Sequence, residues 1–188
     1  MRVFVAVDIP DPLRLGISKL QERLSAKGVR DIRWARPSGI HLTLRFCGEI
    51  PAETLKLLLE ALARGAPLLP FRAALGQLGT FPPRGAPRVL VLSLVGMEEM
   101  NHLAAWVGER CEAAGVPRES RRFHPHLTLG RFRAGARRIP RELQEASQDL
   151  AGAEIDVDRF KIFQSHLGSD GARYQALAEF PLLARGAS

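Results

Sequence analysis

A tetrapeptide that occurs twice places the strongest constraint on how this chain can fold. The sequence His-Leu-Thr-Leu stands at His41–Leu44 and again at His126–Leu129. Chance does not account for two copies, because the 188 residues include only 5 histidines and 4 threonines. The flanking sequence repeats as well, since Gly28-Val29 is followed 87 residues later by Gly115-Val116. We therefore predict an internal duplication, whose period exceeds the roughly 20–50 residues of solenoid repeats.

Both halves of the chain show the same order of expected elements. In the first half, short apolar runs predict strands at Arg2–Val7, His41–Phe46 and Phe71–Leu78. Helices are predicted at Leu13–Ala26 and Ala52–Arg64, because apolar residues there recur at helical spacing and a glycine follows each segment. The second half has predicted strands Arg88–Leu92, His126–Phe132, Ile155–Phe163 and Tyr174–Phe180 and helices Glu98–Ala114 and Arg141–Leu150. We therefore predict one α+β domain over residues 1–188, with repeat units at approximately 2–81 and 88–180. The units should form two lobes related by a pseudo-twofold axis, with the proline-rich segment 82–87 as their linker.

Composition narrows the class of protein and of partner. Hydrophobic residues make up 46% and charged residues 25%, a globular balance, and no apolar run approaches the ~18 residues of a membrane helix. Lysine and arginine total 27 against 20 acidic residues, and 23 of the 27 are arginine, whose forked guanidinium suits phosphate. The charge indicates an anionic partner, nucleic acid or a phosphoester, unless it only reflects genomic base composition. The sequence opens directly on a predicted strand, so we expect no signal peptide. Its two cysteines match no metal or redox spacing, which favours free thiols in a reducing compartment. We therefore expect a cytoplasmic protein.

The duplicated strand carries residues suited to acid–base chemistry. Alternate residues of a strand face one side, so His41 shares a face with Thr43, and His126 shares one with Thr128. Two imidazoles can act as base and acid near neutral pH, and threonine hydroxyls can donate to phosphate oxygens, without a metal. The alternatives are a structural pair, a metal site formed by His41, His124 and His126, or an RNA-binding module that does no chemistry.

With these two motifs, the chain resembles the 2H phosphoesterase superfamily, which is defined by two His-x-Thr motifs. More narrowly, it is similar to the bacterial and archaeal RNA 2′,3′-cyclic phosphodiesterases, historically called 2′-5′ RNA ligases. The resemblance runs over nearly the whole chain. Its motifs are Arg2–Pro10, Trp34–Glu49, Phe81–Arg84, Phe123–Arg131, Gln164–Leu167 and Gly171–Tyr174.

This resemblance implies a bilobal α+β fold with antiparallel sheets lining a central cleft and helices outside. It implies hydrolysis of RNA or nucleoside 2′,3′-cyclic phosphate ends to 2′-phosphomonoesters, with no metal or cofactor. By motif position, His41 would be the general acid and His126 the general base, an assignment that the pseudo-symmetry leaves open. Weak joining or cleavage of 2′-5′ linkages in the same cleft is the alternative activity. The expected partners are RNA with a cyclic phosphate end or a small cyclic nucleotide, with no membrane, and a monomer is the default state.

Four further residues are candidates for substrate binding. Arg45 continues the face of His41 by strict alternation, so it is a phosphate or RNA contact or an exposed strand-end arginine. Arg131 matches the family motif, although alternation points it away from the cleft unless a bulge or twist intervenes. His124 can line the same face two residues before the second motif. Tyr174 can stack on a base, as aromatic side chains do at single-stranded RNA ends.

Other residues near the motifs have simpler interpretations. Phe81 is expected in the core, with base stacking as its alternative role. Alternation places Cys47 on the face of His41, either as a small apolar residue or as an oxidisable thiol beside the cleft. The pairs Arg121-Arg122 and Arg137-Arg138 are expected on connections, where they are solvated or guide RNA.

Overall fold

The computed structural model describes residues 1–95, 98–133, 148, 150, 152–168 and 171–183. The strands are β1 (Arg2–Asp8), β2 (Ile32–Trp34), β3 (His41–Glu49), β4 (Phe71–Phe81), β5 (Val89–Val95), β6 (His126–Phe132), β7 (Glu154–Val157), β8 (Arg159–Gly168) and β9 (Gly171–Pro181). The helices are α1 (Asp11–Ala26), α2 (Ala52–Leu62), α3 (Glu98–Ala113) and a short 3-10 turn η1 (Pro37–Gly39). The predicted α+β class is confirmed. The expected helix at Arg141–Leu150 lies outside the described residues, apart from Gln148 and Leu150.

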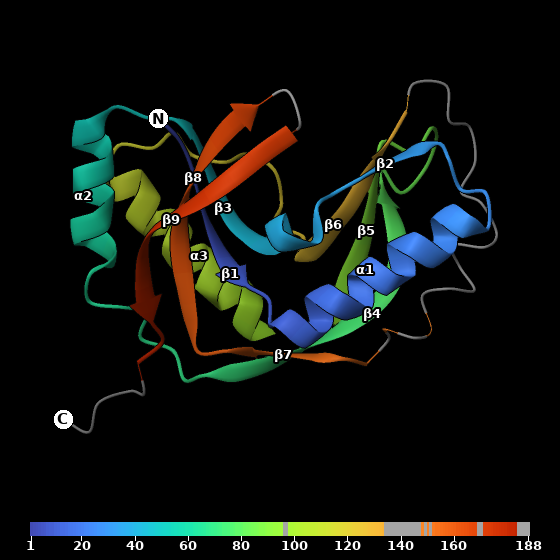
Figure 1. Cartoon of the computed structure of the whole chain (residues 1–188). Coiled ribbons are helices and arrows are strands. Elements are labelled where there is room, and N and C mark those ends of the chain that lie inside the picture. Colours follow the sequence, from blue (N-terminus) through green and yellow to red (C-terminus); the bar gives the residue numbers. More distant parts are fainter. Residues whose placement is uncertain (96–97, 134–147, 149, 151, 169–170, 184–188) are drawn as a thin grey trace.

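The strands form one antiparallel sheet that divides at its centre. Its order is β7-β4-β5-β6-β3-β1-β8-β9, with β2 attached to β6. The two central strands, β3 and β6, meet at a single register pair, Leu42 opposite Leu127. Figure 1 shows β1, β8 and β9 on one side of this junction and β4, β5 and β2 on the other. The two motif strands therefore lie side by side at the centre of the sheet.

The two lobes do not coincide with the two halves of the sequence. Strand β4 comes from the first half but pairs with β5 and β7, whereas β8 and β9 return from the second half to pair beside β1. Segment 82–87 is thus the loop of the β4–β5 hairpin, and its prediction as a linker between lobes is wrong. Proline and glycine mark turns and linkers alike, so composition could not separate the two.

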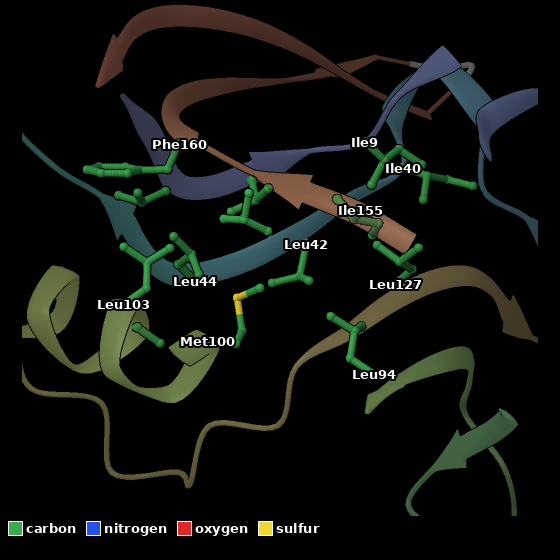
Figure 2. Packing of buried hydrophobic residues seen from close by; sticks show 14 of the residues in the cluster. Ile9, Ile40, Leu42, Leu44, Leu94, Met100, Leu103, Leu127, Ile155 and Phe160 are labelled. Carbon is green, nitrogen blue, oxygen red and sulfur yellow. The ribbon is translucent and has the colours of Figure 1, made fainter. Parts of the chain in front are cut away.

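The helices cover the outer side of the sheet and bury its leucines. The predicted apolar stripe of α1 is confirmed, because Leu13, Ile17, Leu20 and Leu24 are all buried. Helix α1 reaches across to β6, where Gln21 donates a hydrogen bond from Nε2 to the carbonyl of Leu129. Figure 2 shows the side chains of the β3 leucines directed toward those of α3 in the buried cluster. Of the described helices, none has both the length and the apolar character to span a bilayer.

Candidate active site

The duplicated motif places its polar and apolar residues on opposite faces, as predicted. The four motif leucines are buried on the helix side, whereas His41, Thr43, His126 and Thr128 are half-buried on the other side. Because β3 and β6 are antiparallel with Leu42 opposite Leu127, the adjacent positions set His41 across from Thr128 and Thr43 across from His126. Each histidine therefore faces the threonine of the other motif across the centre of the sheet.

Both imidazoles are oriented by the same kind of hydrogen bond. Nδ1 of His41 lies 2.8 Å from the carbonyl oxygen of Gly39, in the η1 turn. Nδ1 of His126 lies 2.6 Å from the carbonyl oxygen of His124. A carbonyl only accepts, so each Nδ1 carries the proton and donates it. In both neutral rings Nε2 is then the free acceptor, available for proton transfer.

Burial lowers the pKa of both histidines. Desolvation lowers the pKa of His41 to about 4, against the opposing effects of the Gly39 carbonyl and the Asp8 carboxylate. Arg14 and His126 add smaller effects that also lower it. Desolvation likewise lowers the pKa of His126, against the opposing effect of the His124 carbonyl, and the His124 side chain adds a smaller effect that lowers it. Both rings are therefore neutral in the ligand-free protein at neutral pH.

A carboxylate distinguishes the two otherwise similar histidines. Asp8 lies opposite His41 in the β1–β3 register. Its Oδ1 accepts a hydrogen bond from Arg14, and its Oδ2 lies 3.1 Å from Nζ of Lys161. Sequence reasoning did not single out Asp8, although an aspartate at the end of a buried strand was a signal. Its negative charge favours the protonated form of His41 and has no described counterpart beside His126.

A bulge in β3 removes Arg45 from the face of the motif histidine. On β1, Ala6 pairs with Thr43 but Val5 pairs with Arg45, so Leu44 is an extra residue. Arg45 therefore points to the helix side, where it is buried and donates a hydrogen bond to the carbonyl of Pro117. The prediction that it shares a face with His41 is wrong, because alternation fails at a bulge.

Phe46 takes the position that alternation assigned to Arg45. Residues Phe4 and Ala6 of β1 share a face, and their partners are Phe46 and Thr43. The Phe46 ring is 45% exposed and lies parallel to Phe4, at 6.3 Å between ring centroids. Sequence reasoning missed this residue because only the pairing with β1 reveals the bulge.

The same irregularity in β6 brings Arg131 onto the motif face. Its register with β5 shifts by one residue at Leu129. Consequently the partners of Val89, Val91 and Ser93, which are alternate residues of one strand, are Arg131, Thr128 and His126. Arg131 is exposed on this face. The bulge that its placement required is present.

Aromatic rings pack against both histidines. Phe4 stacks on His41 with ring centroids 4.5 Å apart, and Tyr174 meets His41 edge-on at 5.1 Å. Phe81 meets His126 edge-on at 4.9 Å and is only half-buried, so its expected core position is wrong. His124 is exposed; its carbonyl oxygen accepts the hydrogen bond from Nδ1 of His126, and its ring centroid lies 6.2 Å from that of Phe81.

The cysteines lie away from the motif face. A second register shift falls at Cys47, which turns toward α3, so its expected place beside the cleft is wrong. Its Sγ lies 3.9 Å from Sγ of Cys111, and both thiols are buried and free. Among the described residues, no three side chains of histidine, cysteine, aspartate or glutamate gather as metal ligands would.

Three solved structures share this fold over nearly the whole chain. TT0787 of Thermus thermophilus superposes with a TM-score of 0.81 at 33% identity, with 100% of both chains covered. Escherichia coli LigT in its apo form superposes with a TM-score of 0.75 at 27% identity, with 96% of both chains covered. A further structure described as a phosphoesterase gives a TM-score of 0.76 at 26% identity, with 96% of this chain and 98% of that chain covered.

The family follows from the sequence match. The model of the 2′-5′ RNA ligase superfamily matches residues 9–168, and the chain belongs to this family. The RNA 2′,3′-cyclic phosphodiesterase of Archaeoglobus fulgidus is 32% identical over 180 residues, which cover 96% of this chain and 99% of the relative. The protein of the same name from Thermus thermophilus is 34% identical, with 97% and 90% covered. The predicted resemblance is confirmed, as is the prediction of a phosphodiesterase of the hydrolase class.

Proposed function

We propose that the protein hydrolyses RNA or nucleoside 2′,3′-cyclic phosphate ends to 2′-phosphomonoesters through its two motif histidines, without a metal. One observation carries this proposal: two imidazoles with identically bonded Nδ1 atoms flank one central register pair, each across from a threonine. This arrangement suits in-line displacement at phosphorus, which needs a base on one side and an acid on the other. Relatives named RNA 2′,3′-cyclic phosphodiesterase support the substrate class.

In the proposed reaction, Nε2 of neutral His126 removes a proton from water as the water oxygen attacks phosphorus. The bond from phosphorus to O3′ breaks, and protonated His41 delivers its Nε2 proton to that oxygen. Thr43 and Thr128 donate hydrogen bonds to the non-bridging oxygens, where negative charge accumulates. The proximity of Asp8 supports His41 as the acid because the carboxylate stabilises the imidazolium.

Burial opposes this assignment in the free protein, and the substrate must compensate. The pKa of His41 is lowered to about 4, so most molecules hold a neutral ring at neutral pH. A phosphate anion bound beside the ring favours its charged form and raises its pKa. Proton loading of His41 and substrate binding are thus coupled in the proposed mechanism.

The pH dependence follows from this coupling. We expect a bell-shaped kcat/KM whose alkaline limb lies below the ordinary histidine pKa of 6.5, because burial lowers the pKa of both histidines in the free protein. The kcat profile, which reports the substrate complex, should extend to higher pH, because the phosphate raises the pKa of the acid. Initial rates measured across pH on a cyclic mononucleotide test this expectation. A kcat/KM that still increases above about pH 7 contradicts it.

The direct test is phosphorus NMR of an oligonucleotide with a 2′,3′-cyclic phosphate end, incubated with the protein and excess EDTA. We expect the cyclic signal to be replaced by that of a 2′-phosphomonoester alone. Formation of a 3′-phosphomonoester would reverse the assigned leaving oxygen. A reaction abolished by EDTA and restored by a divalent cation would refute metal independence. An unchanged signal in folded protein would favour an RNA-binding module without this chemistry.

The alternative activity on 2′-5′ linkages is tested in the same spectrometer. Adding an oligonucleotide with a free 5′-hydroxyl offers an alcohol in place of water as the attacking group. The family description supports this second candidate. A new phosphodiester signal would identify joining, and its rate relative to hydrolysis would show which reaction the cleft favours.

A further inference from the structure

A groove leads away from the motif face on the His126 side. It has a volume of about 720 Å³ and lies between α3 and the segment Arg118–His124. Its inner end is formed by Thr43 and His126, together with the rings of Phe46 and Phe81. We name it the α3 groove. Because it begins at the proposed reaction centre, part of a bound substrate can continue into it.

Arg45 gives the groove a buried cation. Its side chain lines the groove and is only 7% exposed. One guanidinium nitrogen donates to the carbonyl of Pro117, but Nε has no hydrogen-bond partner. Buried polar groups without a partner are rare, since each costs free energy unless it is satisfied. Arg45 is thus a buried cation at the groove wall whose hydrogen bonds are incomplete, and its positive charge favours an anion in the groove.

The outer part of the groove adds further cations. Nε of Arg118 lies 3.9 Å from Oε1 of Glu112, and Nε of Arg121 lies 3.3 Å from Oε1 of Glu119. Each of these two arginines is therefore paired with a carboxylate. Arg122 also lines the groove and forms no ion pair with any described residue. Glu109 lines the groove as well, so the four arginines of the lining exceed its three carboxylates, those of Glu109, Glu112 and Glu119, by one positive charge.

We infer that the α3 groove binds the phosphodiester chain of RNA beyond the reacting end, with Arg45 and Arg122 contacting backbone phosphate. Phe81 at the inner end offers a ring for base stacking, and the exposed Phe46 adds aromatic surface beside it, with the Arg2 guanidinium 5.1 Å from its ring centroid. Cations that follow a backbone and aromatic rings that stack on bases form the usual combination for single-stranded nucleic acid. This inference rests on the proposed function, and it makes an RNA of several nucleotides, rather than a cyclic mononucleotide, the preferred substrate of the site.

The test compares two substrates, adenosine 2′,3′-cyclic monophosphate and a trinucleotide with a 2′,3′-cyclic phosphate end. The measured quantity is the ratio of their kcat/KM values. We expect the wild-type ratio to favour the trinucleotide and Arg45→Met to reduce that ratio about tenfold or more, the loss typical of one hydrogen bond to a charged group. Arg122→Ala should reduce it several-fold. For each phosphate contact that a variant removes, the negative slope of log kcat/KM for the trinucleotide against log salt concentration should become shallower by about 0.7.

A matched control separates the groove from net charge. Arg64 is exposed and does not line the groove, so Arg64→Ala removes the same charge and should keep the wild-type ratio. If Arg45→Met does not fold, Arg122→Ala still tests the groove because its side chain is exposed. Equal losses on both substrates, or a wild-type ratio near one, would overturn the inference while leaving the proposed function in place. A wild-type protein inactive on both substrates would instead overturn the proposed function, and the inference with it.

Discussion

Replacing His126 by alanine is expected to reduce kcat/KM on a 2′,3′-cyclic phosphate by about 10²–10⁴-fold, the usual contribution of a positioned acid or base. His41→Ala should cause a loss of similar size, because each reaction cycle needs both proton transfers. The double variant should lose less than the product of the two single effects, since the two groups act as a unit. Steady-state rates on a cyclic mononucleotide provide the measurement.

His102 provides the control for these variants. It is an exposed histidine on α3 outside the motif face, so His102→Ala should retain the wild-type rate. Thermal unfolding of each variant shows whether the loss is chemical or structural. A folded His41→Ala or His126→Ala protein with near-normal turnover would refute the paired-histidine mechanism.

Leu127→Ala is expected to lower the free energy of unfolding by about 2–5 kcal/mol, the range for a large-to-small change in a packed core. Leu127 has no exposed surface, and with Leu42 it forms the single register pair between the two central strands. Loss of its side chain leaves a cavity at the junction of the lobes. Urea denaturation followed by circular dichroism measures the change.

The matched control is Leu15→Ala on α1, because Leu15 is 57% exposed. This change should alter the free energy of unfolding by no more than about 0.5 kcal/mol, as is typical of surface substitutions. If Leu127→Ala proved as mild as Leu15→Ala, the junction between the lobes would not depend on this side chain. The packing argument for the site would then fail.

Local pattern was sufficient to predict the central part of the site. The repeated His-Leu-Thr-Leu motif located His41 and His126, and alternation correctly separated the two histidines and two threonines from the leucines. Helix α1 was predictable for the same reason, since its buried positions follow from spacing within one segment. These features depend on residues close together in sequence, where the physical rules are strongest.

Features that depend on distant segments could not be predicted in this way. Whether Arg45 or Phe46 faces the cleft is decided by the register of β3 against β1, which the sequence of β3 does not contain. The face on which Arg131 lies is decided in the same way by the register of β6 against β5. The charge of Asp8 becomes relevant only when β1 lies beside His41. In each case, the missing information was the identity and register of the neighbouring strand.

The exchange of strands between the lobes also affects how the protein is assembled. Strand β1 takes β8, more than 150 residues later in the chain, as a neighbour, and β4 leaves the first half to pair with β5. Pairing over such separations favours slow folding, because long loops must close before the contacts form. A polypeptide cut in the β4–β5 loop would leave two pieces that each lack strands of both lobes. Each piece should therefore be inactive alone and regain activity only when the two associate, so that catalysis directly reports whether the whole chain has folded.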